Sequence, residues 1–387
     1  MAKASAIEDE VIEKGFKKIC FNARKMFLNG TAMPGGYTVY GHQVAGHRFE
    51  TGKQGMLLDS DGKLLKPIQA PPRGEREVEF YQTVFGCETS DQSILRLRQF
   101  VPTFHGVKHV VFPGLPFKVD NYIILENLTR HFNKPCILDI KIGKCVTDHR
   151  ATEAKRERAF KKYPQQEEFG FRILGMKFFS KSCEHFTFYD KTFGKNLRTQ
   201  AEILMGLKEF FCQEEHGKGH IEEILKNLEA IKLWALEQRI FRLYSSSVLI
   251  IYEGNKINCM VTENLASDFN TMPNRDSAVK EQTEKSIQGT NAINNSELCS
   301  AKLCTGTSAL QNGYSNFADM TNSAAKCKDM HNCWLQNETH SRKPNVGIHL
   351  VDFAHTYIGH YQAPDSNYLY GLDNLIQYVG QLLDSNV

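Results

Sequence analysis

The sequence lacks any apolar run that approaches the ~18 residues needed to cross a membrane. Residues 1–18 are charged and contain no apolar core of the kind that a secretory signal peptide carries. We therefore expect a soluble intracellular protein. The net charge of +3, from 47 Lys and Arg against 44 Asp and Glu, is too even for a dedicated nucleic-acid-binding protein. No direct nucleic-acid binding is expected.

Several chemical motifs are also missing. None of the 11 cysteines forms a Cys-x-x-Cys pair, which argues against structural zinc, and their odd number argues against a closed disulfide set, so we expect free thiols. The chain has no Gly-x-Gly-x-x-Gly loop, no Walker A sequence and no His-Arg-Asp loop. An ordinary protein kinase is therefore disfavoured. With 387 residues and 41% hydrophobic content, the chain can build a sizeable core.

An acid and a cation stand two residues apart on one apolar strand, in Pro135-Cys-Ile-Leu-Asp139-Ile-Lys141-Ile-Gly143. The period of two in a strand directs both side chains to the same face. Burying either charge alone is costly, so this face is expected to open on a metal, a phosphate or both. The alternative is a structural salt bridge.

Further polar residues follow predicted strands. Lys66 ends a predicted strand of a hairpin that turns at Asp61-Gly62. Glu77 lies in the next predicted helix, 75–85. Protein kinases use such a pair, a strand Lys with a helix Glu, to hold nucleotide phosphates. The alternative is a surface lysine beside a solvated helix. Asp352 ends the apolar strand 346–351, where a carboxylate suits magnesium; an N-cap is the alternative. Glu126-Asn127-Leu128 follows another apolar strand. This segment is either a hinge between two lobes, whose backbone groups would meet adenine, or an ordinary strand exit.

A charged helix is predicted over 153–163. Lys155, Arg158 and Lys162 are spaced i, i+3 and i+7, so they share one face, with Arg156 and Lys161 beside it. Such a face suits an acceptor that bears several phosphates. A solvated surface is the alternative. Apolar spacing predicts two more helices, over 221–241 and 369–383.

The composition changes over residues 255–344. Asn, Ser, Thr, Lys and Ala dominate, and apolar residues are sparse and aperiodic, so the segment cannot offset its ordering entropy. It predicts a disordered insert at the tip of a hairpin with strands 247–252 and 347–352, and protein partners could be bound there.

These motifs together resemble the inositol polyphosphate kinase family, most closely its multikinase branch. The resemblance covers nearly the whole chain except the N-terminal tail and the insert, and it rests on the Pro-x-x-x-Asp-x-Lys-x-Gly strand together with several other segments. These segments are His42-Gln-Val-Ala-Gly-His47, Asp61-Gly-x-x-Leu-Lys66, Pro71-Pro-Arg-Gly74 with Glu77-x-Glu-Phe-Tyr81, Phe132-Asn-Lys-Pro-Cys136, Lys162-Tyr-Pro164, Gly170-Phe-x-x-Leu-Gly-Met176, Ser246-Ser247-Val-Leu249 and Asp352-Phe-Ala-His355.

The resemblance implies an α+β, two-lobed, protein-kinase-like fold with a disordered insert. The implied parts are an N-terminal tail or helix (1–30), an N-lobe (31–126), the first part of the C-lobe (127–254), the insert (255–344) and the completion of the C-lobe (345–387). ATP and Mg²⁺ are the implied cofactors.

The resemblance also implies residue roles. Lys66 and Glu77 would serve the phosphates, and Glu126, Asn127 and Leu128 would hold adenine. Asp139 and Lys141 would be catalytic, with Asp139 and Asp352 binding metal and nucleotide. The implied acceptor-binding residues are Arg73, Lys155, Arg158, Lys162, Lys191 and His355.

The expected activity is the phosphorylation of soluble inositol trisphosphate and tetrakisphosphate towards the pentakisphosphate. The family extends this expectation to phosphatidylinositol bisphosphate headgroups at membrane surfaces. The alternatives are a catalytically weak inositol-phosphate-binding scaffold and a trisphosphate 3-kinase of narrower specificity. A location in nucleus and cytoplasm is expected from the family.

Overall fold

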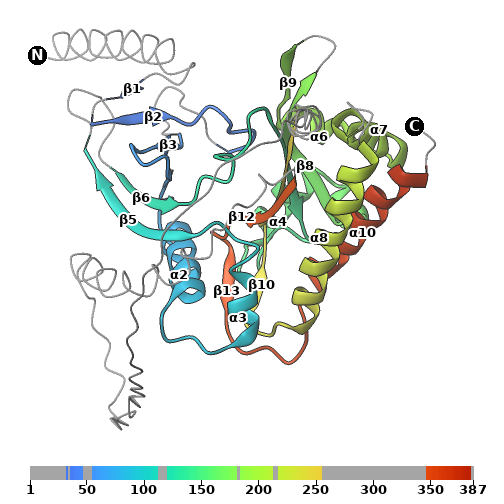
Figure 1. Ribbon diagram of the computed structural model, residues 1–387. Helices are drawn as coiled ribbons and strands as arrows, with labels where there is room; N and C mark the ends of the chain where they lie inside the picture. The colour runs from blue at the N-terminus through green and yellow to red at the C-terminus, as the bar shows by residue number, and fades with distance from the viewer. Residues whose placement is uncertain are drawn as a thin grey trace, which may run out of the picture. The chain divides into compact units, whose positions relative to one another are not determined.

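The computed structural model describes residues 32–33, 35–46, 55–111, 120–180, 184–211, 217–254 and 346–384 (Figure 1). All of them belong to one of the two compact units into which the chain divides. The expectations for the tail (1–30) and for the insert (255–344) lie outside the described residues. Among the described residues, no helix combines the length and the apolar character that a membrane span requires.

The N-terminal part builds one antiparallel sheet with the strand order β1-β2-β3-β4-β6-β5. Its strands are β1 (Ala32–Met33), β2 (Tyr37–Val39), β3 (Leu57–Leu58), β4 (Leu64–Pro67), β5 (Phe104–Val110) and β6 (Asp120–Leu125). The predicted hairpin is present: β3 pairs with β4, Gly62 adopts φ +77°, and the Asp59 carboxylate accepts hydrogen bonds from the Asp61 and Lys63 amides. Helices α2 (Arg73–Phe85) and α3 (Gln92–Leu97) connect β4 to β5.

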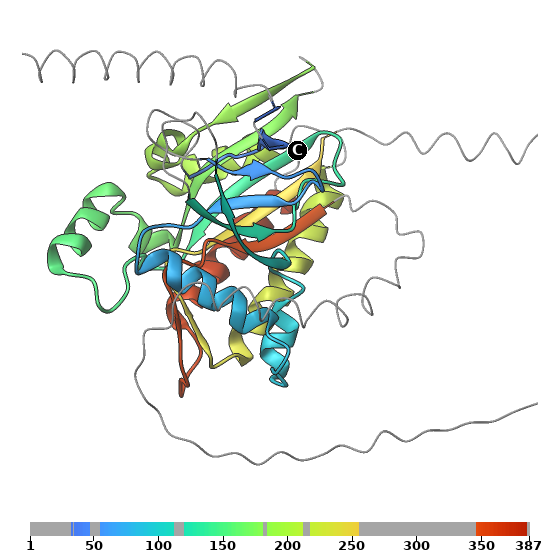
Figure 2. The ribbon, with the colours of Figure 1, turned by 90° about the vertical axis from the view of Figure 1, so that its left-hand side faces the viewer.

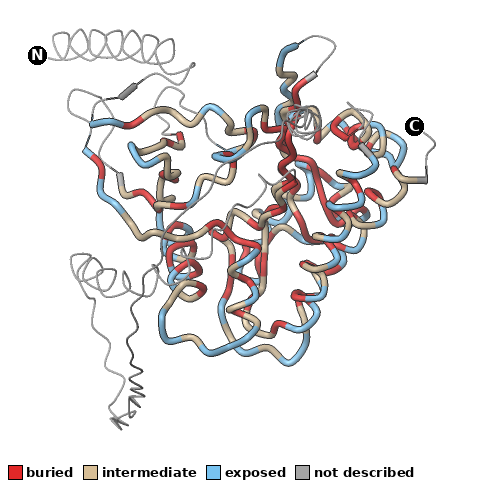
Figure 3. Tube along the Cα trace, viewed as in Figure 1, coloured by how far each residue is buried: buried red, intermediate tan, exposed pale blue. Residues whose placement is uncertain are grey.

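The C-terminal part builds a second antiparallel sheet with the strand order β12-β11-β7-β8-β9. Its strands are β7 (Pro135–Ile142), β8 (Phe171–Ser180), β9 (His185–Tyr189), β11 (Ser247–Glu253) and β12 (Val346–Val351). The strand with Asp139 and Lys141 is the central one. Its nearly continuous apolar sequence fits this place, because it is covered on both faces (Figure 3). The predicted pairing of strands 247–252 and 347–352 is present in β11 and β12.

Helices complete the C-terminal part. They are α4 (Glu153–Lys162), α5 (Gln166–Phe169), α6 (Lys191–Asn196), α7 (Gln200–Phe211), α8 (Gly217–Glu237) and α10 (Ser366–Asp384), and a two-stranded sheet joins β10 (Phe241–Leu243) to β13 (Thr356–Ile358). The apolar spacing correctly predicts α8 and α10, which pack along each other. The α4 helix, green in Figure 2, buries none of its residues. The predicted α+β fold class is confirmed.

Two glycines in the family-like segments are required by the backbone. Gly143 ends β7 with φ +115°, a conformation that other residues rarely adopt. Gly175 on β8 allows the loop after β2 to approach, since a Cβ there would lie 2.3 Å from the Val44 carbonyl oxygen. The expectation of free thiols holds for Cys136 and Cys145 and is wrong for Cys87, which is disulfide-bonded. An odd number of cysteines means that they cannot all be paired, but it does not prevent one disulfide from forming.

Candidate active site

The ammonium group of Lys66 joins the two sheets. Its Nζ donates to Glu77 Oε1 on α2 and to Asp352 Oδ1 after β12, both at 2.6 Å. Glu77 is fully buried and also accepts from the backbone amide of Phe353 at 3.3 Å. Although burial by itself lowers the pKa of Lys66, the two carboxylates raise it well above its ordinary value. The predicted pairing of Lys66 with Glu77 is therefore present, and Lys66 stays charged.

Asp352 is the first residue after strand β12. Its backbone adopts φ +66°, a strained conformation that aspartate tolerates better than most residues. The side chain is 40% exposed, in contrast to fully buried Glu77. Burial alone would raise the pKa of Asp352, but the charges of Lys66 and Lys141 hold it below its ordinary value. Asp352 is thus an ionised carboxylate with a solvent-facing side, which an N-cap role does not require.

Asp139 is buried without a complete set of partners. Its Oδ1 accepts no hydrogen bond, and burial together with the negative charge of Asp352 raises its pKa to about 7. Two carboxylates that repel each other in this way lower each other's tendency to ionise unless a cation intervenes. The structure does not support the alternative of a simple Asp139–Lys141 salt bridge, because Lys141 Nζ instead donates to the Ser245 carbonyl oxygen at 2.5 Å.

This donor set fits a divalent cation. Asp139 and Asp352 offer hard carboxylate oxygens, and an orphaned buried oxygen is the kind of atom that a metal would satisfy. In the parts of the chain that the structure describes, no group of three or more His, Cys, Asp or Glu side chains is placed to hold a metal. The two carboxylates would therefore leave several positions of the metal to water and to phosphate oxygens, as magnesium sites usually do.

The hinge segment presents backbone groups beside a small apolar cluster. The Glu126 amide donates to the Thr103 carbonyl at 2.9 Å, and the Glu126 carboxylate accepts from the Thr103 amide and hydroxyl. Asn127 uses its side chain to accept from the Thr129 amide. Within the described ranges, the Glu126 carbonyl and the Leu128 amide hold no hydrogen bond. Leu128 packs with Val44, Ile137 and Ile251. An acceptor, a donor and an apolar surface thus lie together.

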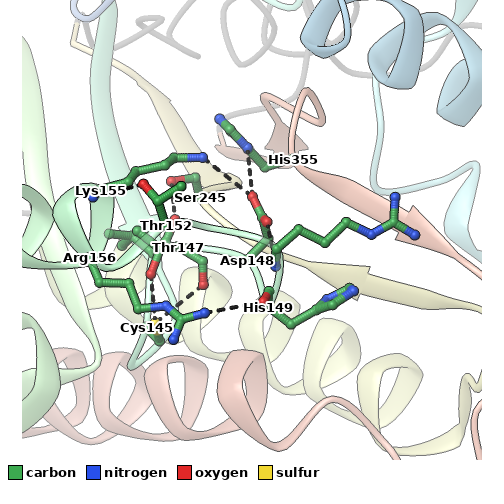
Figure 4. Close-up of polar contacts among 11 residues, drawn as sticks. Cys145, Thr147, Asp148, His149, Thr152, Lys155, Arg156, Ser245 and His355 are labelled. Atoms are coloured by element: carbon green, nitrogen blue, oxygen red, sulfur yellow. Dashed lines mark hydrogen bonds and ion pairs between the residues drawn. The ribbon is translucent and has the colours of Figure 1, made fainter.

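One group of predicted acceptor-binding residues surrounds Asp148, which sequence reasoning missed. Lys155 Nζ lies 3.4 Å from Asp148 Oδ2, and His355 Nδ1 lies 3.6 Å from the same oxygen (Figure 4). Burial, and then the charge of Lys155, lowers the pKa of His355, with Lys141 and Arg73 contributing. His355 is therefore neutral at pH 7. The charges of Arg73, Lys141 and Lys155 thus all act on the His355 side chain.

A second group of cations lies at the other end of α4. Burial lowers the pKa of Lys162, and the charges of Arg172, Lys195 and Lys191 lower it further. Lys162 and Lys191 were predicted; Arg172 and Lys195 were missed.

Arg158 joins neither group. Its Nε donates to the Ala154 carbonyl of its own helix at 3.1 Å, and its side chain is exposed. We call Lys155, Arg158 and Lys162 the α4 triad; their shared helical face spans about two turns, so its ends meet different neighbours. The role of Arg158 stays a prediction.

The missed residues carried weak sequence signals. Arg172 stands inside the apolar strand Phe171–Ser180, the same kind of signal that identified Asp139. Ser245 adopts φ +56°, so its carbonyl reaches Lys141, and a sequence shows no such backbone geometry. Asp148 lies in a loop, and only its burial distinguishes it from a surface acid.

Comparisons with known proteins agree with these features. The family model described as inositol polyphosphate kinase matches residues 122–380. The inositol polyphosphate multikinase of Rattus norvegicus is 30% identical to the chain, over 91% of this chain and 93% of the rat protein. The human multikinase is 36% identical over 60% of this chain and 53% of its own length. A solved structure of the inositol phosphate multikinase Ipk2 from S. cerevisiae, in complex with ADP and Mn²⁺, is 22% identical with a TM-score of 0.49, and the match covers 83% of this chain and 99% of that one.

Proposed function

Because this chain belongs to the inositol polyphosphate kinase family, we propose that it is a multikinase that phosphorylates inositol trisphosphate and tetrakisphosphate towards the pentakisphosphate. At the coarser level, it is an ATP-dependent inositol phosphate kinase. The observation that carries the proposal is the set of Lys66, Asp139, Lys141 and Asp352, held together from β4, β7 and the end of β12. A scaffold that only bound inositol phosphates would not need this set.

The nucleotide would be held by groups from both sheets. The Glu126 carbonyl and the Leu128 amide, which hold no hydrogen bond to any described residue, suit the donor and acceptor edge of adenine, and the apolar cluster around Leu128 would lie beneath the base. Lys66 supplies a fixed positive charge for the phosphates. Asp139 and Asp352 would hold Mg²⁺, which neutralises charge on the phosphates when bound.

Asp139 also suits the proton transfer. In the reaction, the acceptor hydroxyl oxygen bonds to the γ-phosphorus of ATP, the bond from that phosphorus to the bridging oxygen breaks, and the hydroxyl proton must leave. The Asp139 carboxylate, on the same strand as Lys141, would accept this proton as a general base. Lys141, held by the Ser245 carbonyl, would stabilise the negative charge on the transferred group.

The acceptor would meet two groups of polar residues. One holds the cations Arg73 and Lys155 with neutral His355, and the other holds the cations Lys162 and Lys191. Their separation along α4 suits a ring that carries phosphates on more than one side. The similarity to the rat multikinase, which extends over 91% of this chain and 93% of that protein, supports several acceptors in preference to the narrower trisphosphate 3-kinase. Exposed cations on α4 also leave room for phosphatidylinositol bisphosphate headgroups as an extension of the same chemistry.

The test is a product analysis. The protein, ATP and Mg²⁺ are incubated with inositol 1,4,5-trisphosphate, and the products are separated by chromatography and assigned by NMR, with Asp139→Asn as the control. Sequential tetrakis- and pentakisphosphate support the multikinase, a single tetrakisphosphate supports the 3-kinase, and no product supports the scaffold. Vesicles that contain phosphatidylinositol bisphosphate, in a parallel reaction, test the lipid extension.

The cellular location is proposed to be the nucleus and the cytoplasm, on the ground of family membership alone. Imaging of a fluorescently tagged full-length chain in fixed and live cells tests it. Exclusion of the tagged protein from the nucleus would refute the nuclear part of the proposal. Binding of protein partners through residues 255–344 is proposed from composition only, and a pull-down with and without this segment would test it.

A further inference from the structure

Arg172 occupies a place where a cation is unfavourable in the free protein. It lies on β8 directly opposite Lys141 of β7 in the antiparallel register. Like charges that face each other across paired strands destabilise a sheet. Only 6% of Arg172 is exposed, so water screens this repulsion poorly.

No acidic group in the described parts of the chain forms an ion pair with the guanidinium of Arg172. Arg172 has no ion pair and no hydrogen bond to any residue in the described parts of the chain, and its buried Nε lacks a partner. Its guanidinium carbon lies 5.3 Å from the centroid of the Tyr163 ring, a cation–π contact. The Tyr163 hydroxyl donates to the Leu197 carbonyl at 2.7 Å, and among the described residues its oxygen accepts no hydrogen bond from Arg172. Burying a cation without a partner costs free energy, and no ion pair among the described residues offsets this cost for Arg172.

Other cations lie around it. Arg172 interacts electrostatically with Lys141 and Lys162, and Lys162 also interacts with Lys191 and Lys195 at the start and end of α6. Asp190, which precedes Lys191, caps α6 by accepting from the Thr192 amide at 2.8 Å. We call Lys162, Arg172, Lys191 and Lys195 the Arg172 cluster. Among the described residues no member of this cluster forms an ion pair with a carboxylate, and cations that gather in this way are typical of a site that receives an anion.

We infer that Arg172 is a substrate-binding residue whose guanidinium binds a phosphate group of the inositol phosphate acceptor, with the other members of the Arg172 cluster at the rim. The inference rests on the proposed function and adds a residue to its acceptor site. Arginine is suited to this role because its planar group can hold a phosphate with two hydrogen bonds while it stays charged in a buried position. The energetic cost of Arg172 in the free protein is then recovered when the acceptor binds.

The test is the Arg172→Leu variant, which replaces the buried cation by an apolar side chain. We expect its melting temperature without ligand to be equal to or higher than that of the wild type, because an uncompensated charge is removed. At the same time, the KM for inositol 1,4,5-trisphosphate should rise about tenfold or more, and the KM for ATP should stay unchanged. A purely structural arginine predicts the opposite pair of results: lower stability and an unchanged acceptor KM.

Two further variants keep the test decisive. Arg172→Lys retains the charge without the planar group, so its acceptor KM should lie between those of the wild type and Arg172→Leu; it also serves if Arg172→Leu fails to fold. Lys226→Leu, which removes an exposed lysine on α8, is the matched control and should change neither KM. An unchanged acceptor KM in both Arg172 variants would overturn the inference.

A binding measurement separates this inference from the proposed function. Inositol hexakisphosphate is used as a probe, and its effect on the melting temperature is recorded for the wild type and for Arg172→Leu. The variant should lose most of the ligand-induced increase. If the wild type shows this Arg172-dependent increase and yet phosphorylates no inositol phosphate, the proposed function fails and anion binding by Arg172 stands. If the wild type is active and the increase is the same in both proteins, only the inference fails.

Discussion

The two carboxylates that share Lys66 should have separable roles, and substituting each in turn tests this. Glu77 is fully buried and accepts from both Lys66 and the Phe353 amide, whereas the Asp352 side chain is 40% exposed. The perturbations are Glu77→Gln and Asp352→Asn, which keep the size of each side chain and remove only its charge. The matched control is Glu79→Gln, at an exposed glutamate on the same helix.

Burial sets the expected magnitudes. Glu77→Gln weakens a charge-assisted hydrogen bond in a fully buried place, so the free energy of unfolding should fall by about 1.5–3 kcal/mol. For a domain of this size, that corresponds to a melting temperature lower by roughly 3–12 °C. Asp352→Asn leaves Lys66 paired with Glu77 and removes the repulsion on Asp139, so the free energy of unfolding should change by less than about 1 kcal/mol.

Activity should show the reverse order. Asp352→Asn removes a carboxylate that faces solvent at the proposed nucleotide and metal position, and kcat should fall by about 100-fold or more. Glu77→Gln, assayed well below its melting temperature, should lose less. Thermal unfolding and steady-state kinetics on the three variants supply both readouts. If Asp352→Asn destabilised the protein as much as Glu77→Gln while keeping near-normal kcat, Asp352 would be a structural acid and the reasoning would be refuted.

Three further predictions concern the rest of the site and the sheet. Asp139→Asn and Lys141→Ala should each lower kcat by about 100- to 1,000-fold without loss of the circular dichroism of the fold; a folded variant that kept about a tenth of normal activity would contradict its role. Replacing the α4 triad by Ala should raise the acceptor KM at least about tenfold and much more than the ATP KM, and the effect should shrink at high salt; an unchanged acceptor KM would leave α4 as a solvated surface. Burial lowers the pKa of His349 on β12 to about 4, below its unfolded value, so the unfolded chain binds the extra proton and stability falls as the pH drops from about 6.5 to 4. Denaturant titrations should therefore show that His349→Gln loses less stability than the wild type over this range, by about 3 kcal/mol, and parallel curves would disprove it.

The sequence by itself determined the elements and much of the site, for local reasons. The Asp61-Gly62 turn, the apolar spacing of α8 and α10, and the nearly continuous apolar run of β7 each depend on neighbouring residues, and each element is present in the structure. Asp139 and Lys141 stood out because charges are conspicuous on an apolar strand. The pairing of Lys66 with Glu77 was also predictable, since 11 positions of chain join them.

Only the tertiary structure decided which distant groups meet. Lys66 and Asp352 are 286 positions apart in the sequence, and Lys141 is 104 positions from Ser245, whose carbonyl accepts its hydrogen bond. No local pattern therefore predicts either contact. The cross-strand register placed Arg172 opposite Lys141, so a charge on an apolar strand became a buried cation without an ion pair among the described residues. The helical period correctly placed the α4 triad on one side of a helix, but what each side chain faces depends on packing. Lys155 pairs with Asp148, Lys162 interacts with the other cations of the Arg172 cluster, and Arg158 donates to a carbonyl of its own helix. Burial and electrostatics are properties of the folded neighbourhood, and for that reason a sequence identifies candidate residues while the fold determines their partners.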